Sequence, residues 1–163
     1  MSLNGYIFLL PKEIKVLIGV FVIVLSIGFF SGLLFVGETS SVNPNGIEEQ
    51  YLGNEHDEDA EVMKFKKSDQ EMLSIVHSHI LSMSLIFFLL GLIVSITKLK
   101  QRVKIFLMVE PLLSVLLTFG GLYFMWTGVI WMKYIVMFSG TLMTLSFLLS
   151  VVIILKQLFE KKP

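Results

Sequence analysis

The sequence contains no cysteine. Without thiols the chain can form neither a disulfide nor a thiolate site for zinc or an iron–sulfur cluster, and it cannot attach a c-type haem covalently. It also has no nucleophile-triad pattern, no phosphate-binding glycine loop and no HExxH zinc motif. The formal net charge is zero. We therefore expect no catalytic activity of the chain's own and no nucleic-acid partner.

Charged residues are scarce, and long apolar runs take their place. Charged residues make up 16% of the chain and hydrophobic residues 55%, with a mean hydropathy of +0.80. Four apolar runs are long enough, at about 1.5 Å per residue, to cross a hydrocarbon core of roughly 30 Å. The sequence predicts helices over about 13–36, 69–97, 103–125 and 131–156. We expect a single all-α membrane domain spanning 1–163, an up-down-up-down four-helix bundle in the lipid bilayer.

The charges are segregated along the chain, and this predicts which side each segment faces. Nine of the thirteen basic residues fall in the two terminal segments and the connection at 97–104. The positive-inside rule then puts both termini in the cytoplasm and the acidic loop 37–67 outside it. Spanning helices instead of a barrel indicate the bacterial inner membrane. The first run is too long for a signal peptide, so we expect it to be retained.

The stretch "SDQEMLSIVHSH", residues 68 to 79, opens the second predicted helix. Ser68 and Glu71 have the spacing of a capping box, so the first polar turns should protrude from the membrane. His77 and His79 would then lie at the outer interface. Residues two apart on a helix point about 200° apart, so the pair cannot bind one metal ion together.

The neighbours of the two histidines suggest different roles for them. His77 shares a helix face with Ser74, Ser84 and Gly91, small residues that leave room for a helix or a flat cofactor, and we expect it to face the bundle. His79 lies four residues before Met83, a possible soft ligand. Either histidine could bind a metal, a quinone or haem b. A haem would need a further axial ligand, such as a Met, Lys or Tyr or a histidine from another subunit. Alternatively, both merely bond to headgroups or loop groups.

Glu110 is the second candidate, because it is a carboxylate inside a predicted membrane helix. It lies six residues beyond Lys104, or about 9 Å along the helix axis, and precedes Pro111. A carboxylate at such a depth is costly unless it is protonated, paired or hydrated. Glu110 is therefore either a proton- or quinone-linked group or the partner of a Lys104 or Arg102 side chain. The histidines and Glu110 lie toward opposite membrane faces, so we do not expect one shared site.

The acidic run "NEHDEDAE" at 54–61 offers oxygen ligands at alternating positions. It lacks the glycine and the terminal glutamate of a calcium-binding EF-hand loop. We interpret it as a solvated loop that could attract a basic partner.

The motifs "YLGNE", "FKKS", "EML" and "HSH" together resemble a pattern of small uncharacterised bacterial four-helix inner-membrane proteins. In that pattern a Tyr-x-Gly loop leads into Lys-Ser-x-x-Glu-x-Leu and then His-x-His. The resemblance covers about residues 46–95. It implies an association with respiratory or other electron-transfer complexes. It also implies that the loop and the histidine helix form one unit, with Tyr51 and Glu71 holding the histidines. The matching residues are Tyr51, Gly53, Lys67, Ser68, Glu71, Leu73, His77, His79 and Gly91.

Three functional hypotheses follow. The leading one is an accessory membrane subunit of a respiratory or other electron-transfer complex, which works with other membrane protein subunits. Its site for haem, a metal or quinone would be the outer histidine pair. The alternative is a homo-oligomeric bundle that conducts protons or ions through Glu110. The third is a structural scaffold whose acidic loop recruits a partner.

Overall fold

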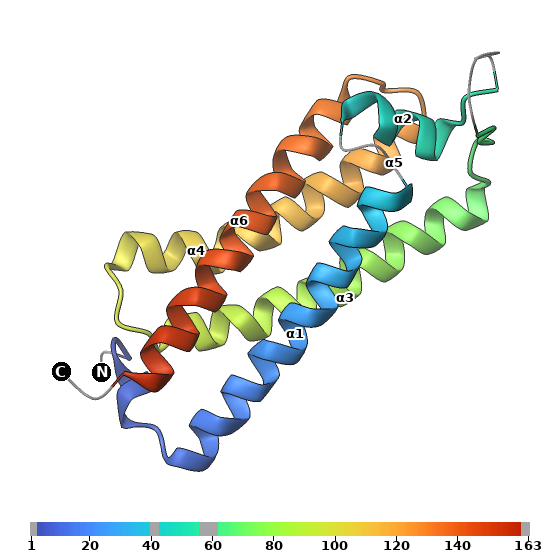
Figure 1. Cartoon of the computed structure of the whole chain (residues 1–163). Helices are drawn as coiled ribbons and strands as arrows, with labels where there is room; N and C mark the ends of the chain where they lie inside the picture. The colour runs from blue at the N-terminus through green and yellow to red at the C-terminus, as the bar shows by residue number, and fades with distance from the viewer. Residues whose placement is uncertain (1–2, 40–42, 56–61, 161–163) are drawn as a thin grey trace.

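The computed structural model describes residues 3–39, 43–55 and 62–160, and within these ranges it is helical without strands. Four segments are long and apolar enough to span a membrane, which confirms the predicted fold class (Figure 1). They are α1 (Lys12–Thr39), α3 (Asp69–Ser95), the series α4 (Gln101–Val115), η2 (Leu116–Gly120) and α5 (Gly121–Trp126), and α6 (Met132–Phe159). A 3-10 turn η1 (Tyr6–Leu9) and a short helix α2 (Pro44–Leu52) complete the fold. Most of the acidic run, 56–61, lies outside the described residues.

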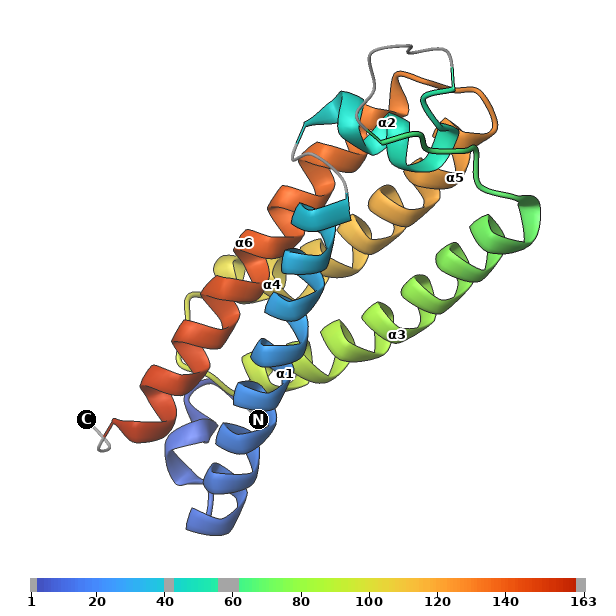
Figure 2. The same ribbon diagram turned by 45° about the vertical axis from the view of Figure 1, so that its right-hand side comes forward.

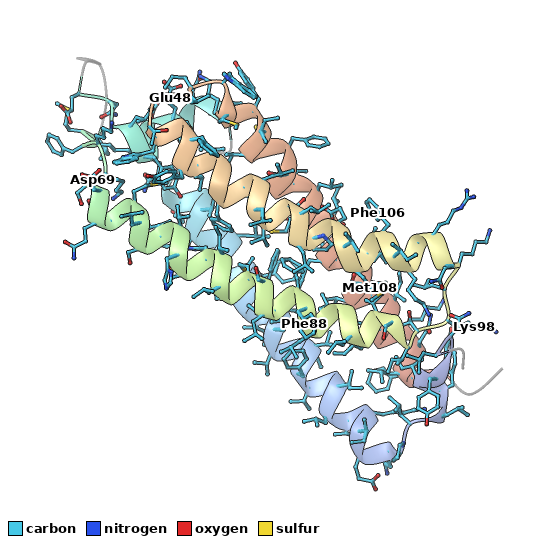
Figure 3. The ribbon with its side chains drawn as sticks, turned by 180° about the vertical axis from the view of Figure 1, so that it is seen from behind. Glu48, Asp69, Phe88, Lys98, Phe106 and Met108 are labelled. Atoms are coloured by element: carbon cyan, nitrogen blue, oxygen red, sulfur yellow. The ribbon has the colours of Figure 1, made fainter. Side chains whose placement is uncertain are left out.

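Successive spans run in opposite directions, so the bundle has two distinct ends (Figures 1 and 2). At one end, hereafter the terminal end, the start of the chain meets the α3–α4 connection and the end of α6. There the Leu99 amide donates to Asn4 Oδ1 at 3.1 Å and the Lys98 amide donates to Gln157 Oε1 at 2.7 Å. The opposite end, hereafter the cap end, carries α2; Figure 3 shows Glu48 and Lys98 at opposite ends.

Helix α3 begins with the predicted capping box. The Glu71 amide donates to Ser68 Oγ at 3.3 Å, and the Ser68 amide donates to Glu71 Oε2 at 2.8 Å. These bonds satisfy two amides that the first helical turn would otherwise leave without acceptors. The cap therefore fixes where the histidine helix starts.

The third span is not the single uniform helix that the sequence predicts. Pro111 lies inside α4, and its missing N–H leaves the Leu107 carbonyl without its usual helical donor. The π turn η2 follows, and the axis of the span changes direction between α4 and α5 (Figures 1 and 3). Proline and π turns are common causes of helix kinks. Both lie next to or within a group of buried polar residues described below.

The core lies where α3, α4 and α6 meet. Gly91 faces α4, and a Cβ built there would lie at ordinary contact distance, 3.8 Å, from the Met108 Cα atom, so a side chain larger than a methyl group would meet the α4 backbone. Large apolar side chains from all three helices fill the rest of this contact. The main ones are Phe87, Leu90, Val94, Leu107, Val115, Met143, Phe147, Val151 and Ile154.

Helix α1 lies at the edge of this core. Only 11% of its apolar window is buried inside the bundle, against 50% for the third span. Its clearest anchor is Phe29, whose ring stacks on Phe147 at 4.0 Å between centroids and meets Phe87 edge-on at 6.4 Å. Most of the α1 surface is therefore available to lipid.

At the cap end, α2 folds over α5 and α6 as a helix that the sequence analysis did not predict. Asn43 caps it by accepting the Gly46 amide at 2.7 Å, and Gly53 ends it with a φ of +84°. An ion pair docks it, because Lys133 Nζ lies 2.6 Å from Glu48 Oε2. The segment between α2 and α3 is held separately by the Trp126 indole, which donates to the Lys67 carbonyl at 2.9 Å.

Candidate functional site

The two histidines of α3 are both exposed, but only one of them packs against the bundle. The His79 ring stacks on Phe119 of η2, with 4.6 Å between centroids, and its Nδ1 lies 2.8 Å from the Ile75 carbonyl oxygen. Our expectation that His77 faces the bundle is therefore wrong. Gly91 is one of the small residues that suggested this orientation, and the space beside it is occupied by Met108 of α4.

The residues expected to support the histidines have other contacts. The Glu71 carboxylate accepts the Ser68 amide in the capping box and lies 3.9 Å from Lys67 Nζ. Tyr51 belongs to the cap end, where its carbonyl accepts the Lys67 amide at 3.0 Å, and burial raises the pKa of its hydroxyl. Met83 is half-buried and packs against the core.

The described part of the chain contains no group of three or more His, Asp or Glu side chains arranged to hold a metal ion. The imidazoles of His77 and His79 also diverge around α3, as their spacing predicts. Within one chain, therefore, only one of the two histidines can bind a given metal ion or haem iron. A haem b here would need a second axial ligand from elsewhere, such as a Met, Lys or Tyr or a histidine of another subunit.

Glu110 lies deep in the bundle, with 8% of its surface exposed. Its Oε1 accepts a hydrogen bond from the Ser114 hydroxyl one turn later. Its Oε2 is buried and, alone among the buried side-chain oxygen and nitrogen atoms of the described residues, has no hydrogen-bond partner. One oxygen of a membrane-embedded carboxyl group is thus available to a proton or a water molecule.

The cation expected to pair with Glu110 is used elsewhere. Lys104 is buried, and its Nζ donates to Asn4 Oδ1 and to the Ser95 carbonyl, both at 2.9 Å. Arg102 is exposed. Neither of them forms an ion pair with Glu110 among the described residues. The interpretation of Glu110 as a partner for a lysine or arginine from the helix end is therefore wrong.

Further buried hydroxyl groups continue from Glu110 toward the cap end. Thr118 Oγ1 lies 2.8 Å from Ser139 Oγ of α6, and Ser139 Oγ lies 2.7 Å from the Ile135 carbonyl. Ser114 is 2% exposed, Thr118 8% and Ser139 1%. Together with Glu110 they form a polar group, hereafter the Glu110 track, between the third span and α6.

Sequence reasoning identified Glu110 but missed its hydroxyl neighbours on the same helix. Glu110, Ser114 and Thr118 recur every four residues, which places them on one helix face. This polar spacing within an apolar run was the signal that could have found them. Ser139 could not be found in the same way, because no sequence pattern shows that it faces Thr118.

Comparison with known proteins gives the family. The sequence profile named Aq_1264_TM, a transmembrane helical domain, matches residues 41–163, which is more than half of the chain. The chain belongs to the Aq_1264_TM family. No curated protein and no solved structure matches it.

The extent of the family match bears on the fold. The Aq_1264_TM domain includes α3, α4, η2, α5 and α6, and so contains both the histidines and the Glu110 track. Helix α1 lies before the matched residues, in agreement with its position at the edge of the core. This chain is thus a multi-pass integral membrane protein in which both candidate sites belong to the family domain.

Proposed function

We propose that the protein conducts protons through the membrane, with Glu110 as the intramembrane group that takes them up and releases them. The observation that carries the proposal is the buried Oε2 atom without a hydrogen-bond partner. A carboxyl group in hydrocarbon is tolerated when it is protonated, paired or hydrated. Because Lys104 is hydrogen-bonded to Asn4 and Ser95, it does not pair with Glu110. The carboxyl group must then be stabilised by protonation or by hydration.

The location of the carboxyl group suits this role. Along the helix axis Glu110 lies about 13 Å from the start of α4 and about 9 Å beyond Lys104, inside the apolar part of the span. Intramembrane ionisable groups that face a bundle interior are characteristic of proton relays. The charge distribution supports a cap end that faces out of the cytoplasm.

The test is proton flux in proteoliposomes that contain the purified protein. Glu110→Gln keeps the shape and the Ser114 contact but cannot take up a proton, so flux should fall about a hundredfold, the usual order for loss of a positioned acid–base group. Glu160→Gln is the matched control, since Glu160 is exposed at the terminal end. Equal flux in wild type and Glu110→Gln would disprove the proposal.

A second candidate function is that of an accessory subunit of a larger membrane complex, of the respiratory or another electron-transfer type. A specific feature of α3 favours it: Ser74, His77, Ser78 and Ser82 are all exposed along one side of a membrane helix. Polar side chains on such a surface are stabilised by hydrogen bonds to another helix. A partner at this surface could also supply the second ligand that a haem at His77 would need.

Cross-linking tests the second candidate directly, because the chain has no native cysteine. A Ser78→Cys variant in native membranes should cross-link to a neighbouring subunit, whereas Leu73→Cys, exposed on another side of the same helix, should not. A Soret band in the purified complex that disappears in His77→Ala would support the haem version. Without a cross-link at Ser78 the subunit hypothesis fails, and without a Soret band or bound metal its cofactor version fails.

A further inference from the structure

The π turn η2 brings the two candidate sites together, although their positions in the sequence separate them. On one side of the turn, the Phe119 ring stacks on His79 of α3. On the other side, the hydroxyl of the preceding residue, Thr118, contacts Ser139 of α6. An exposed imidazole thus lies one residue away from the end of the Glu110 track.

The hydrogen bond made by His79 fixes which of its nitrogens can exchange a proton. Its Nδ1 lies 2.8 Å from the Ile75 carbonyl oxygen, and a carbonyl only accepts hydrogen bonds. Nδ1 therefore carries the hydrogen in the neutral ring, and Nε2 is the nitrogen that gains and loses a proton. Imidazole is the side chain best suited to exchange protons near neutral pH.

The hydroxyl groups of the track can be assigned as donors and acceptors. A hydroxyl has one hydrogen, and Ser139 gives its hydrogen to the Ile135 carbonyl. Thr118 must then donate to Ser139, while Ser114 donates to Glu110 Oε1. Lone pairs on Thr118 and Ser114 are left, together with Glu110 Oε2. These acceptors follow one another along the third span.

The interval between Ser114 and Thr118 matches one water molecule. Four helical residues rise about 6 Å, and two hydrogen bonds of about 2.8 Å through a water span nearly the same length. A buried water needs two to four polar partners, which the Ser114 and Thr118 oxygens can supply. A proton could then pass between them by exchange of hydrogen bonds.

The position of His79 allows contact with water at the cap end. Phe119 lies seven residues before Trp126, so His79 is about 10 Å below the aromatic residues of that end. The exposed side of α3 between the cap and His79 carries the hydroxyl groups of Ser74 and Ser78. Water can reach the imidazole along this polar surface.

We infer that His79 takes up protons from the cap end and delivers them to Glu110 through Thr118, whose hydroxyl turns from Ser139 to the water molecule, and then through that water and Ser114. The inference rests on the proposed function. An imidazolium at His79 releases one proton, each hydroxyl or water accepts a proton as it donates its own, and Glu110 gains one. His79 then takes its next proton from water. The transfer changes no oxidation state. Water that carries the proton between His79 and Thr118 must pass the Phe119 ring.

Aromatic substitution separates proton transfer from packing. His79→Phe keeps a ring on Phe119 but has no nitrogen, so proton flux in proteoliposomes should fall about tenfold or more. Imidazole added on the cap side should restore it. His77→Phe is the matched control, because His77 is exposed two residues away on the same helix, and its flux should stay at the wild-type level.

The hydroxyl relay has its own matched pair. Thr118→Val replaces the hydroxyl by a methyl group of similar size and should lower flux about tenfold, whereas Thr118→Ser keeps the hydroxyl and the flux. Wild-type flux in His79→Phe or Thr118→Val would overturn the inference, as would loss of flux in His79→Phe without rescue by imidazole. If Glu110→Gln alone lowers flux, the relay is wrong and the proposed function stands. If Glu110→Gln has no effect, the proposed function itself fails.

Discussion

Gly53 shows how a single residue holds the cap end in place. Its backbone, at φ +84° and ψ 173°, lies in a region that essentially only glycine adopts. A Cβ atom there would lie 2.8 Å from both the Lys64 carbonyl oxygen and the Lys66 amide nitrogen. No other residue therefore lets the chain turn from α2 toward the segment that leads into α3.

We predict that Gly53→Ala destabilises the docked cap by about 1–3 kcal/mol, the usual cost of one strained backbone conformation. Hydrogen exchange of the α2 amides in detergent micelles should become faster. Gly32→Ala is the control, because a Cβ at Gly32 in α1 meets no other atom within 4 Å. Unchanged exchange in Gly53→Ala would mean that this glycine does not fix the cap.

At the residue scale the sequence predicted local chemistry better than contacts. The capping box was predictable because Ser68 and Glu71 are neighbours in the sequence and bond within one turn. The same bonds explain why Glu71 is not a partner of the histidines. The contact of His79 with Phe119 depends on how α3 meets η2, forty residues later, and no local pattern specifies it.

At the scale of helices, the contact between α3 and α4 depends on Gly91. We predict that Gly91→Leu forces the two helices apart at Met108 and lowers the stability by about 1–3 kcal/mol, as expected for an overfilled core. Thermal unfolding in detergent should occur at a lower midpoint than in wild type. Gly28→Leu, on an open surface of α1, should leave the midpoint unchanged. Equal midpoints for both variants would show that the close approach is not needed.

The break in the third span could be predicted only in part. Pro111 marks a kink in any helix, and its position was evident from the sequence. The π turn at 116–120 was not evident, because its sequence, "LLTFG", differs little from that of a regular membrane helix. Its extra residue is accommodated by packing against α3 and α6, which no local pattern shows. The missed turn is what carries both Thr118 and Phe119.

At the scale of the whole molecule, the four spans could be predicted because each apolar run is long enough to cross the membrane. The sequence did not reveal that α1 packs loosely, since its apolar run is as strong as the others. Nor did it predict α2, a nine-residue helix of low hydropathy that is stabilised by its Asn43 cap and by the contact of Glu48 with Lys133. The charge pattern predicts the orientation in the membrane, which the arrangement of helices by itself does not specify.

The Phe29–Phe147 stack joins the first helix of the bundle to the last one. Since the chain is synthesised from its N-terminus, α1 enters the bilayer long before the helix that holds its anchor exists. During this interval α1 must remain stable as a single helix surrounded by lipid, which its apolar sides permit. The stacked contact of α1 therefore forms only when translation is nearly complete, so a chain that stops after α5 would hold Phe29 only by its edge-on contact with Phe87 of α3.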